Sequence, residues 1–275
     1  MGAADVSALA DEVSAAYAVR RTDVVPPSAR DGGCTLDEAY AVERELSARR
    51  QAAGHRVVGR KVGYANKAVW RALKLETLVW ADMYDDTVQR AVANTGTLSR
   101  ARFAAPKIEP EIVVMMRDRL APGTTDAAAV LAAVEWIALG FEVIDCVYTG
   151  WTFQPADFVA AYGLHAALVV GEPRTVAPAD IPALVDALAR FTVTLARDGQ
   201  PVAEGAGRNS LRSPALCVAE LVSALSRRGG AQPLLAGECV SSGTLTESCP
   251  LAAGETWTAT LTGLDLPPLT LHVAE

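Results

Sequence analysis

The chain has 275 residues, of which 51% are hydrophobic, so it is long enough to bury a large core and shows no compositional sign of disorder. Its formal net charge of −7 and its 25 scattered basic residues exclude the clustered positive charge that nucleic-acid binding requires. A small molecule is therefore the expected partner.

The N-terminus lacks the pattern of a secretory signal, because Asp5 and Asp11 precede any sustained apolar run. The most apolar window, residues 127–144, contains Glu135 and Glu142 and falls short of the about 20 apolar residues that a membrane-spanning helix needs. We therefore expect a cytoplasmic protein that does not associate with membranes.

The cysteines are five in number and widely spaced, without the C-x-x-C pair that is typical of zinc sites or dithiol chemistry. We expect reduced and mostly buried thiols at Cys34, Cys146, Cys217, Cys239 and Cys249.

The sequence pattern of the first 56 residues predicts a helical segment. Apolar residues follow helical spacing over residues 6–17, and Thr35 with Glu38 three positions later forms the capping-box signature of a second helix. The pattern then changes, and we expect residues 57–275 to form one compact catalytic domain.

The rest of the chain mixes strand and helix patterns. Strands are expected at residues 60–63, 108–116, 141–148, 167–170, 191–196, 239–242, 257–261 and 269–273. Helices are expected after the capping residue Asn66 and at residues 126–137, 155–162, 181–189 and 214–227. Asp198-Gly199 between apolar residues is a hairpin signal. Because strict βαβ alternation is missing, we expect an α+β fold built on a rolled, mixed sheet.

Three glutamates in apolar surroundings indicate a metal site. Glu109 and Glu111 lie two residues apart in one predicted strand, so both side chains leave the same face, and Glu142 lies in a second strand. Burying such charges is costly unless a positive charge lies between them. An all-carboxylate site selects a hard cation such as Mg²⁺ or Mn²⁺. The alternative is that Glu109 and Glu111 face solvent on an edge strand marked by Pro110.

Five short motifs follow one another along the chain. They are Gly59-Arg60-Lys61-Val62-Gly63, Met83-Tyr84-Asp85-Asp86, Lys107-Ile108-Glu109-Pro110-Glu111-Ile112, Gly140-Phe141-Glu142-Val143-Ile144-Asp145 followed by Trp151, and Ser242-Gly243-Thr244-Leu245-Thr246 followed by Gly254-Glu255. In this order they resemble the motifs of 2-keto-4-pentenoate hydratases and 4-oxalocrotonate decarboxylases, a branch of the fumarylacetoacetate hydrolase superfamily. The matches cover most of the chain from residue 57 onward.

The resemblance implies a fumarylacetoacetase C-terminal-like fold with an N-terminal helical segment. It also implies that Glu109, Glu111 and Glu142 hold Mg²⁺ or Mn²⁺, and that the substrate is a 2-oxo acid or its dienol, whose enolate a Lewis acid stabilises. The expected reaction is hydration of a 2-hydroxy-2,4-dienoate to a 4-hydroxy-2-oxo acid, as in the meta-cleavage catabolism of aromatic compounds.

Polar residues within these motifs are candidates for the remaining catalytic work. Lys61 is the first candidate for binding the substrate carboxylate or moving protons, although an isolated lysine is usually a solvated surface residue. Asp82 and Asp85 are candidates for orienting Lys61 or activating water, although turn aspartates commonly bond the backbone. Thr244 is a candidate substrate contact.

The chain departs from the family pattern after Trp151. Many hydratases carry a D-N-A-S type stretch where this chain has Ala161-Tyr162-Gly163-Leu164-His165, in a region where substrate contacts are expected. His165 is therefore a candidate acid or base of a modified pocket, with a packed core histidine as the alternative.

Other functions stay open. Decarboxylation of a 4-oxalocrotonate-type 2-oxo-3-enedioate needs a second group for the distal carboxylate, which the sequence does not place. An acylpyruvate or fumarylacetoacetate hydrolase needs a histidine–carboxylate pair, and His55 lacks an evident acidic partner in the sequence. By resemblance we expect a homo-oligomer. A complex with a paralogous hydratase or decarboxylase, in which this chain is a non-catalytic subunit, is the remaining alternative.

Overall fold

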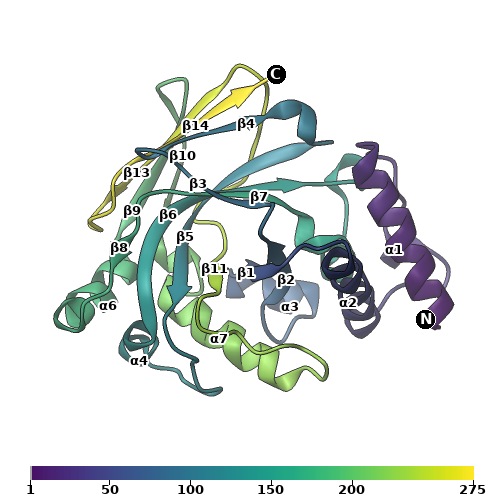
Figure 1. The fold of residues 1–275 in the computed structure, drawn as a ribbon, viewed down its shortest axis with the longest axis horizontal. Coiled ribbons are helices and arrows are strands. Elements are labelled where there is room, and N and C mark those ends of the chain that lie inside the picture. Colours follow the sequence, from purple (N-terminus) through teal and green to yellow (C-terminus); the bar gives the residue numbers. More distant parts are fainter. Residues whose placement is uncertain (1) are drawn as a thin grey trace.

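A strongly curled sheet forms the centre of the molecule in the computed structural model, which describes residues 2–275 (Figure 1). Its nine strands include a continuous path in the order β2-β1-β11-β5-β6-β7-β3, with β12 paired to β5 and β8 paired to β6. The bounds are β1 Val57–Gly63, β2 Val79–Tyr84, β3 Val88–Arg90, β5 Pro106–Met116, β6 Val134–Asp145, β7 His165–Val170, β8 Arg174–Thr175, β11 Cys239–Ser241 and β12 Cys249–Pro250. Because β1 pairs with β11 in parallel and with β2 antiparallel, the sheet is mixed.

A second sheet of five strands lies beside the first, in the order β10-β9-β13-β14-β4 (Figure 1). Its strands are β4 Thr95–Ser99, β9 Thr192–Arg197, β10 Gln200–Ala206, β13 Thr256–Thr262 and β14 Leu269–Ala274. The turn predicted at Asp198-Gly199 joins β9 to the antiparallel β10, which confirms that hairpin.

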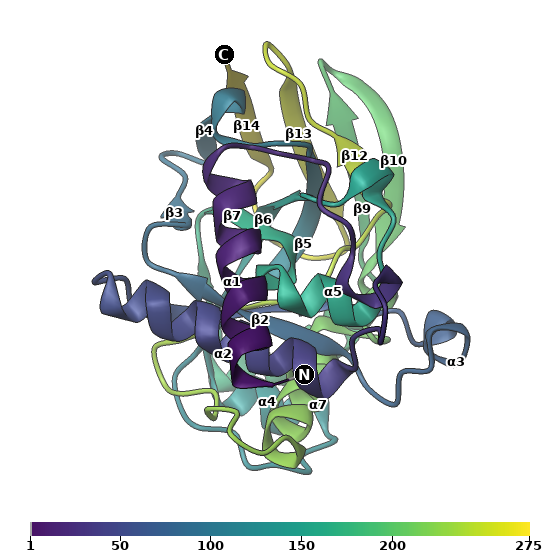
Figure 2. The same ribbon diagram turned by 90° about the vertical axis from the view of Figure 1, so that its right-hand side faces the viewer.

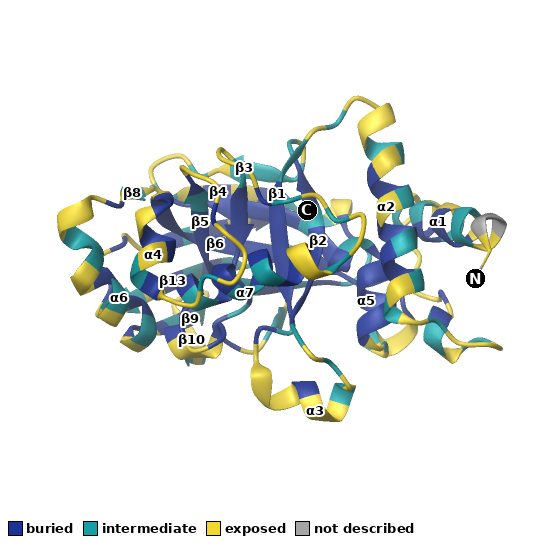
Figure 3. Ribbon diagram, turned by 90° about the horizontal axis from the view of Figure 1, so that it is seen from below, coloured by how far each residue is buried: buried dark blue, intermediate teal, exposed yellow. Residues whose placement is uncertain are grey.

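The helices lie around the sheets. They are α1 Ala3–Ala18, α2 Leu36–Ala52, α3 Trp70–Leu73, α4 Ala127–Ala132, α5 Pro155–Ala160, α6 Ile181–Arg190 and α7 Pro214–Arg227. Helix α2 packs on both α1 and α5 at one side of the large sheet (Figure 2), and α4 packs on α6 and α7 elsewhere (Figure 3). The capping box is present, since Thr35 N donates to Glu38 Oε2 at 2.8 Å and Glu38 N donates to Thr35 Oγ1 at 3.3 Å. The expected α+β fold with a rolled mixed sheet is confirmed.

Two further expectations can be compared with the structure. The five cysteines are free thiols, and Cys146, Cys217 and Cys239 are buried. Within residues 2–275, no helix has the length and apolar character needed to cross a bilayer.

One predicted helix was too long. Helix α4 ends at Ala132, and β6 begins at Val134 rather than near residue 141. The segment is drawn into the sheet because Trp136 and Ile137 pair with Met115 and Val114 of β5 and both side chains are buried there. Tertiary packing overrode the helical propensity of an alanine-rich run.

Strand alternation divides the large sheet into a concave and a convex face. Lys61 faces Ser241 across β1 and β11, and Glu109 faces Glu142 across β5 and β6, which puts these side chains on the concave face. Farther along that face, a small apolar cluster fills the interior of the roll. The cluster consists of Met83, Val113, Trp136, Ala138, Leu168, Val170 and Cys239. The polar residues therefore gather at one end of the roll.

The close approach of β1 and β11 can be tested at Gly59. An ideal Cβ on Gly59 would lie 2.0 Å from the backbone carbonyl oxygen of Cys239, which cannot rotate away. We expect Gly59→Ala to lower the free energy of unfolding by about 2–3 kcal/mol in urea titrations. The control is Gly229→Ala, an exposed position with open space, where a change within about 0.5 kcal/mol is expected. Equal losses in the two variants would contradict this packing.

Candidate active site

Three glutamates converge at the polar end of the roll. Glu109 and Glu111 alternate along β5, and Glu142 lies directly opposite Glu109 on β6. One carboxylate oxygen from each lies within 4.8 Å of the others. The edge-strand alternative for Glu109 and Glu111 does not hold, because β5 pairs with both β6 and β11 and lies inside the sheet.

The neighbours of the glutamates leave two oxygens without hydrogen bonds. Ser241 Oγ donates to Glu111 Oε2 at 2.6 Å, and Gly243 N donates to the same oxygen at 2.8 Å. Glu111 Oε1 and Glu142 Oε2 are buried and accept no hydrogen bond from the described part of the chain, although Glu142 Oε2 lies 3.2 Å from Lys61 Nζ. Buried acceptors of this kind require a partner.

The ionisation of the three carboxyl groups is strongly perturbed. Burial raises the pKa of Glu109 to about 7, with Lys61 and Lys107 opposing that effect. Burial and the charge of Glu142 raise the pKa of Glu111 well above its usual range. Burial also opposes the ionisation of Glu142, but Lys61 and His165 outweigh it and lower its pKa. The basic side chains of the protein therefore favour the charged form of Glu142 but do not offset the effect of burial on Glu109 and Glu111.

These residues fit a divalent cation. Three carboxylates present hard oxygen ligands on one face, with two buried oxygens that lack hydrogen bonds. Mg²⁺ and Mn²⁺ prefer such ligands and take waters or substrate oxygens at their other positions.

Lys61 is buried beside the cluster. Its Nζ donates to Gly163 O at 2.9 Å, and it lies 4.7 Å from the centroid of the Phe158 ring. Gly163 belongs to the turn Tyr162–Leu164, whose three residues all have positive φ. A Cβ on Gly163 would lie 2.9 Å from Lys61 Cδ, so the turn and the lysine fit only with glycine there.

His165 reaches Glu142 because β7 is irregular. The register between β6 and β7 shifts after Val143, so that His165 faces Ile144 and shares the concave face with Glu142. His165 Nδ1 lies 2.8 Å from Glu142 Oε1, and Nε2 lies 2.9 Å from Thr87 Oγ1. Since Thr87 donates its own hydroxyl proton to Tyr84 O, both ring nitrogens face acceptors. The histidine is therefore a buried residue, as one of the two alternatives predicted, and it contacts Glu142 and Thr87 through its two ring nitrogens.

A cleft of about 580 Å³ opens at Glu109, whereas Glu111 and Glu142 do not line it. Lys61, Lys107 and Glu109 line it together with the predicted Thr244, whose Oγ1 donates to Thr246 O at 2.8 Å. Its walls are largely apolar and aromatic, from Val62, Tyr64, Ile144, Trp151, Phe153, Phe158, Leu164 and Leu245. His165 does not line this cleft and lies instead on a second cavity of about 430 Å³ behind Glu142.

Asp82 does not orient Lys61, contrary to expectation. Asp82 lies opposite Arg60 in the β1–β2 ladder, so it faces away from Lys61, which lies opposite Ala81. Its carboxylate pairs with Arg60 Nε at 3.0 Å and accepts from Ser47 Oγ at 2.6 Å. Asp82 therefore ties the sheet to α2.

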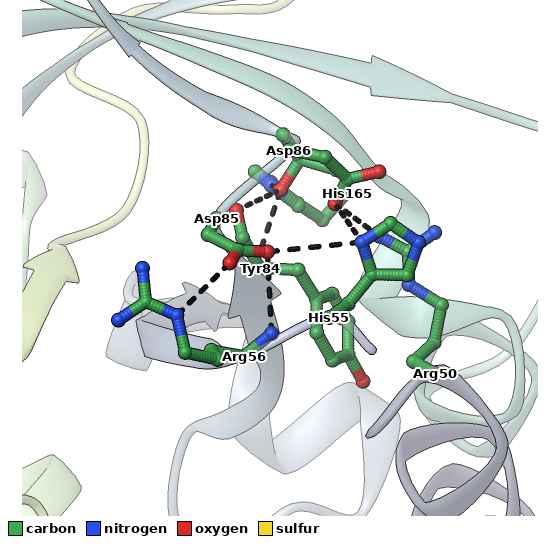
Figure 4. A network of polar contacts seen from close by, with 8 residues as sticks. Arg50, His55, Arg56, Tyr84, Asp85, Asp86 and His165 are labelled. Atoms are coloured by element: carbon green, nitrogen blue, oxygen red, sulfur yellow. Dashed lines mark hydrogen bonds and ion pairs between the residues drawn. The ribbon is translucent and has the colours of Figure 1, made fainter. Parts of the chain in front are cut away.

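Asp85 lies in the turn that follows β2, beside Arg56 and His55 (Figure 4). It accepts hydrogen bonds from Arg56 N and Arg56 Nε, each at 3.2 Å. His55 Nδ1 lies 3.7 Å from Asp85 and 3.5 Å from Asp86, so His55 does have acidic neighbours. None of these residues lines the cleft, and arginines already pair with both aspartates, which argues against a hydrolase site here.

Comparison with known proteins finds related hydratases and decarboxylases, although no family model matches the chain. It is 31% identical over 231 residues to 2-hydroxyhexa-2,4-dienoate hydratase of Comamonas testosteroni, covering 84% of each chain. It is 30% identical to 4-oxalocrotonate decarboxylase of a Pseudomonas species, covering 84% of this chain and 83% of that protein.

A solved structure resembles the whole chain. It is that of 4-oxalocrotonate decarboxylase from Pseudomonas putida complexed with magnesium and adipate, with a TM-score of 0.88, 26% identity and coverage of 99% of this chain and 98% of that one. Fold and relatives together define an enzyme of the hydratase and decarboxylase class. The chain belongs to the 2-keto-4-pentenoate hydratase and 4-oxalocrotonate decarboxylase branch of the fumarylacetoacetate hydrolase superfamily.

The structure adds site residues that the sequence did not suggest. Ser241 and Gly243 form hydrogen bonds with Glu111. Gly163 forms one with Lys61, and Thr87 forms one with His165. Gly243 lies in the recognised late motif, so its backbone contact could have been inferred from that turn. Thr87 carried no local signal, and Gly163 was noted only as part of the divergent stretch 161–165, because their contacts span 78 and 102 residues of sequence.

The perturbed carboxyl groups predict a pH-dependent response to metal. In the metal-free protein the Glu109 carboxyl group stays protonated up to a pH of about 7, whereas in the unfolded chain it loses its proton above its ordinary pKa of 4.5. The free energy of unfolding therefore decreases as the pH rises through this range. A divalent cation competes with those protons, so its stabilising effect must grow over the same range. We expect the difference in Tm between Mg²⁺ and chelator to increase by several degrees from about pH 5 to about pH 8.

The control for this experiment is a glutamate on the same strand as Glu142. Glu135→Gln alters an exposed side chain of β6 and should keep the pH-dependent difference, whereas Glu111→Gln should largely abolish it. A difference in Tm that stays constant with pH in the unmodified protein would refute the proton–metal competition.

Proposed function

We propose that the chain is a divalent-metal-dependent hydro-lyase, which adds water to a 2-hydroxy-2,4-dienoate through its 2-oxo-3-enoate tautomer and yields a 4-hydroxy-2-oxo acid. The observation that carries this proposal is the convergence of Glu109, Glu111 and Glu142, of which Glu109 lines a cleft. Relatives named as hydratases of such dienoates support the choice of substrate.

In this proposal the three glutamates hold Mg²⁺ or Mn²⁺. The bound cation supplies Lewis-acid stabilisation of an enolate at a 2-oxo acid. Relatives crystallised with magnesium, calcium or Mn²⁺ support a divalent metal.

Lys61 supplies the nearest mobile protons. Its ammonium group lines the cleft, and Gly163 O and Glu142 fix its position from two sides. We propose that it binds the substrate carboxylate or transfers protons at the cleft floor. Phe158 and the other apolar walls pack against the carbon chain, and Thr244 contacts the substrate from the late turn.

His165 has a positioning role in this proposal. It does not line the substrate cleft, and its Nδ1 forms a hydrogen bond with Oε1 of Glu142, one of the three proposed metal ligands. Such second partners fix the orientation of a ligand and raise metal affinity.

Decarboxylation of a 2-oxo-3-enedioate is the second candidate. The structural match over 99% of the chain is to a 4-oxalocrotonate decarboxylase, and the same stabilised enolate serves both reactions. Release of CO₂ separates the two.

We also propose that the protein is cytoplasmic and forms a homo-oligomer, by analogy with enzymes of this branch. Light scattering of the purified chain, with and without a paralogous partner, measures both self-association and a mixed complex.

The hydratase proposal is tested by the absorbance decay of 2-hydroxypenta-2,4-dienoate. We expect decay with Mg²⁺ or Mn²⁺, none with chelator, and a loss of at least about 100-fold in Glu109→Ala, because a missing ligand weakens the cation that stabilises the enolate. Glu135→Ala, an exposed position, is the control and should retain activity. Absence of decay under every metal condition would refute the proposal, and CO₂ release from the corresponding dioate would favour decarboxylation.

The role of His165 is tested with His165→Asn. We expect a roughly 10- to 100-fold weaker apparent affinity for Mg²⁺, with most of kcat restored at saturating metal. The control is His272→Asn, since His272 is exposed on β14 and bonds only Thr256 among the side chains described. A kcat that remains low at saturating Mg²⁺ would show that His165 acts in the chemistry itself.

A further inference from the structure

The turn at Tyr162–Leu164 lies between two cavities. Leu164 lines the cleft of about 580 Å³, whereas Tyr162 and the adjoining His165 line the second cavity of about 430 Å³. Tyr162 and Leu164 both have positive φ, a left-handed conformation that residues other than glycine rarely adopt. Because packing around the turn is incomplete on two sides, specific contacts must hold it in this conformation.

A single hydroxyl group of helix α1 reaches the start of this turn. Tyr17 Oη lies 2.9 Å from Asp145 O, at the end of β6, and 3.3 Å from Ala161 O. Ala161 O also accepts from Leu164 N at 2.8 Å, which is the hydrogen bond that closes the turn. The Tyr17 hydroxyl therefore donates one shared proton to two carbonyl groups, and it joins β6, the strand of Glu142, to the turn.

The ring of Tyr17 makes a second contact with the turn. It packs edge-on against the Tyr162 ring, with centroids 5.9 Å apart and an interplanar angle of 63°. Ser14, on the same face of α1, places Oγ 3.3 Å from the Tyr162 hydroxyl. Burial and the charge of Asp145 raise the pKa of Tyr17 well above its usual range, so the phenol stays protonated and remains a donor.

The segment that follows α1 contacts the helix that leads into the turn. Ser28 N donates to Asp157 Oδ1 at 2.7 Å, and Ser28 Oγ donates to Asp157 Oδ2 at 2.5 Å. Asp157 lies in α5 and is fully buried, with Gln154 N as a further donor at 2.7 Å. Helix α1 and its continuation therefore fix both α5 and the turn that follows it.

Two residues of the active site depend on this turn. Lys61 Nζ donates to Gly163 O at 2.9 Å, within the turn. His165, directly after the turn, places Nδ1 2.8 Å from Glu142 Oε1. A displacement of the turn would therefore move both the lysine and the support of a metal-binding carboxylate, and small misplacements of reacting groups lower rates strongly.

We propose that Tyr17 is a positioning residue for the active site, which acts through the turn at residues 162–164. This inference rests on the proposed function, because it assumes that Lys61 and the metal site perform the chemistry. It makes α1 part of the catalytic unit, although the sequence pattern indicated a separate helical segment over the first 56 residues.

The direct test is Tyr17→Phe, which removes the hydroxyl and keeps the ring. At saturating Mg²⁺ we expect kcat for 2-hydroxypenta-2,4-dienoate to fall at least about tenfold, with KM for the dienoate changed by less than about threefold. The apparent affinity for Mg²⁺ should also weaken several-fold, because His165 moves with the turn. His165→Asn, in contrast, should keep most of kcat at saturating metal.

Hydrogen exchange reports on the turn without any turnover. Because the Leu164 amide donates to Ala161 O, its exchange in Tyr17→Phe should be at least about tenfold faster than in the unmodified protein. The Gly171 amide, which donates to Leu139 O just beyond β7, is the internal reference and should keep its rate.

The matched control is Tyr40→Phe. Tyr40 is a buried tyrosine of α2 whose hydroxyl accepts from Trp80 N of β2 at 3.1 Å. This variant also loses one buried hydrogen bond to the backbone, so a comparable decrease in Tm is expected. Its kcat, and the exchange of Leu164 relative to Gly171, should stay unchanged.

The outcomes separate this inference from the proposed function. An unchanged kcat in Tyr17→Phe, or a fall in kcat without faster exchange at Leu164, would overturn the positioning role and leave the hydro-lyase standing. Equal falls in kcat in Tyr17→Phe and Tyr40→Phe would also overturn it, because a general loss of stability would explain both. Failure of the unmodified protein to consume any dienoate with any metal would overturn the proposed function itself, while Leu164 exchange and Mg²⁺ affinity would still test the link between Tyr17 and the site.

Discussion

Mutual repulsion among three carboxylates, of which Glu111 and Glu142 are buried and Glu109 is half-buried, is the constraint on which the site depends. Glu109, Glu111 and Glu142 bring ligand oxygens within 4.8 Å, and the basic side chains in contact with them are Lys61 and His165. Both lie against Glu142, which explains why its pKa falls while those of Glu109 and Glu111 rise. The metal-free site therefore keeps protons on Glu109 and Glu111, and a divalent cation replaces those protons. Burying the charged carboxylates without such a cation would cost several kcal/mol.

The same strand alternation that gathers the carboxylates also secures the sheet on its other face. Arg60 and Lys61 are neighbours on β1 and point in opposite directions. Lys61 enters the site, whereas Arg60 pairs with Asp82, which in turn accepts from Ser47 of α2. One short motif thus supplies a site residue and the attachment of an N-terminal helix, so the position of the lysine depends on packing outside the roll.

Local sequence patterns correctly predicted the features that depend on the alternation of side chains along a strand, on helix capping and on turn residues. The pairing of Glu109 with Glu111 on one face, the α2 capping box and the β9–β10 hairpin all depend on residues close in sequence. The orientation of Asp82 followed from its register with Arg60, which no local pattern contains. His165 reached the concave face only through the shift in register after Val143, and such irregularities depend on the partner strand.

The divergent stretch at residues 161–165 contacts both Lys61 and Glu142. Its left-handed turn places Gly163 O on Lys61, and its last residue places His165 on Glu142. Non-glycine residues at positive φ, here Tyr162 and Leu164, carry strain that persists only where surrounding contacts hold it. The turn supplies two of the contacts that fix Lys61 and Glu142 relative to each other. The sequence departure that suggested a modified substrate pocket thus supplies one wall of the cleft, Leu164, and also the contacts that position Lys61 and Glu142.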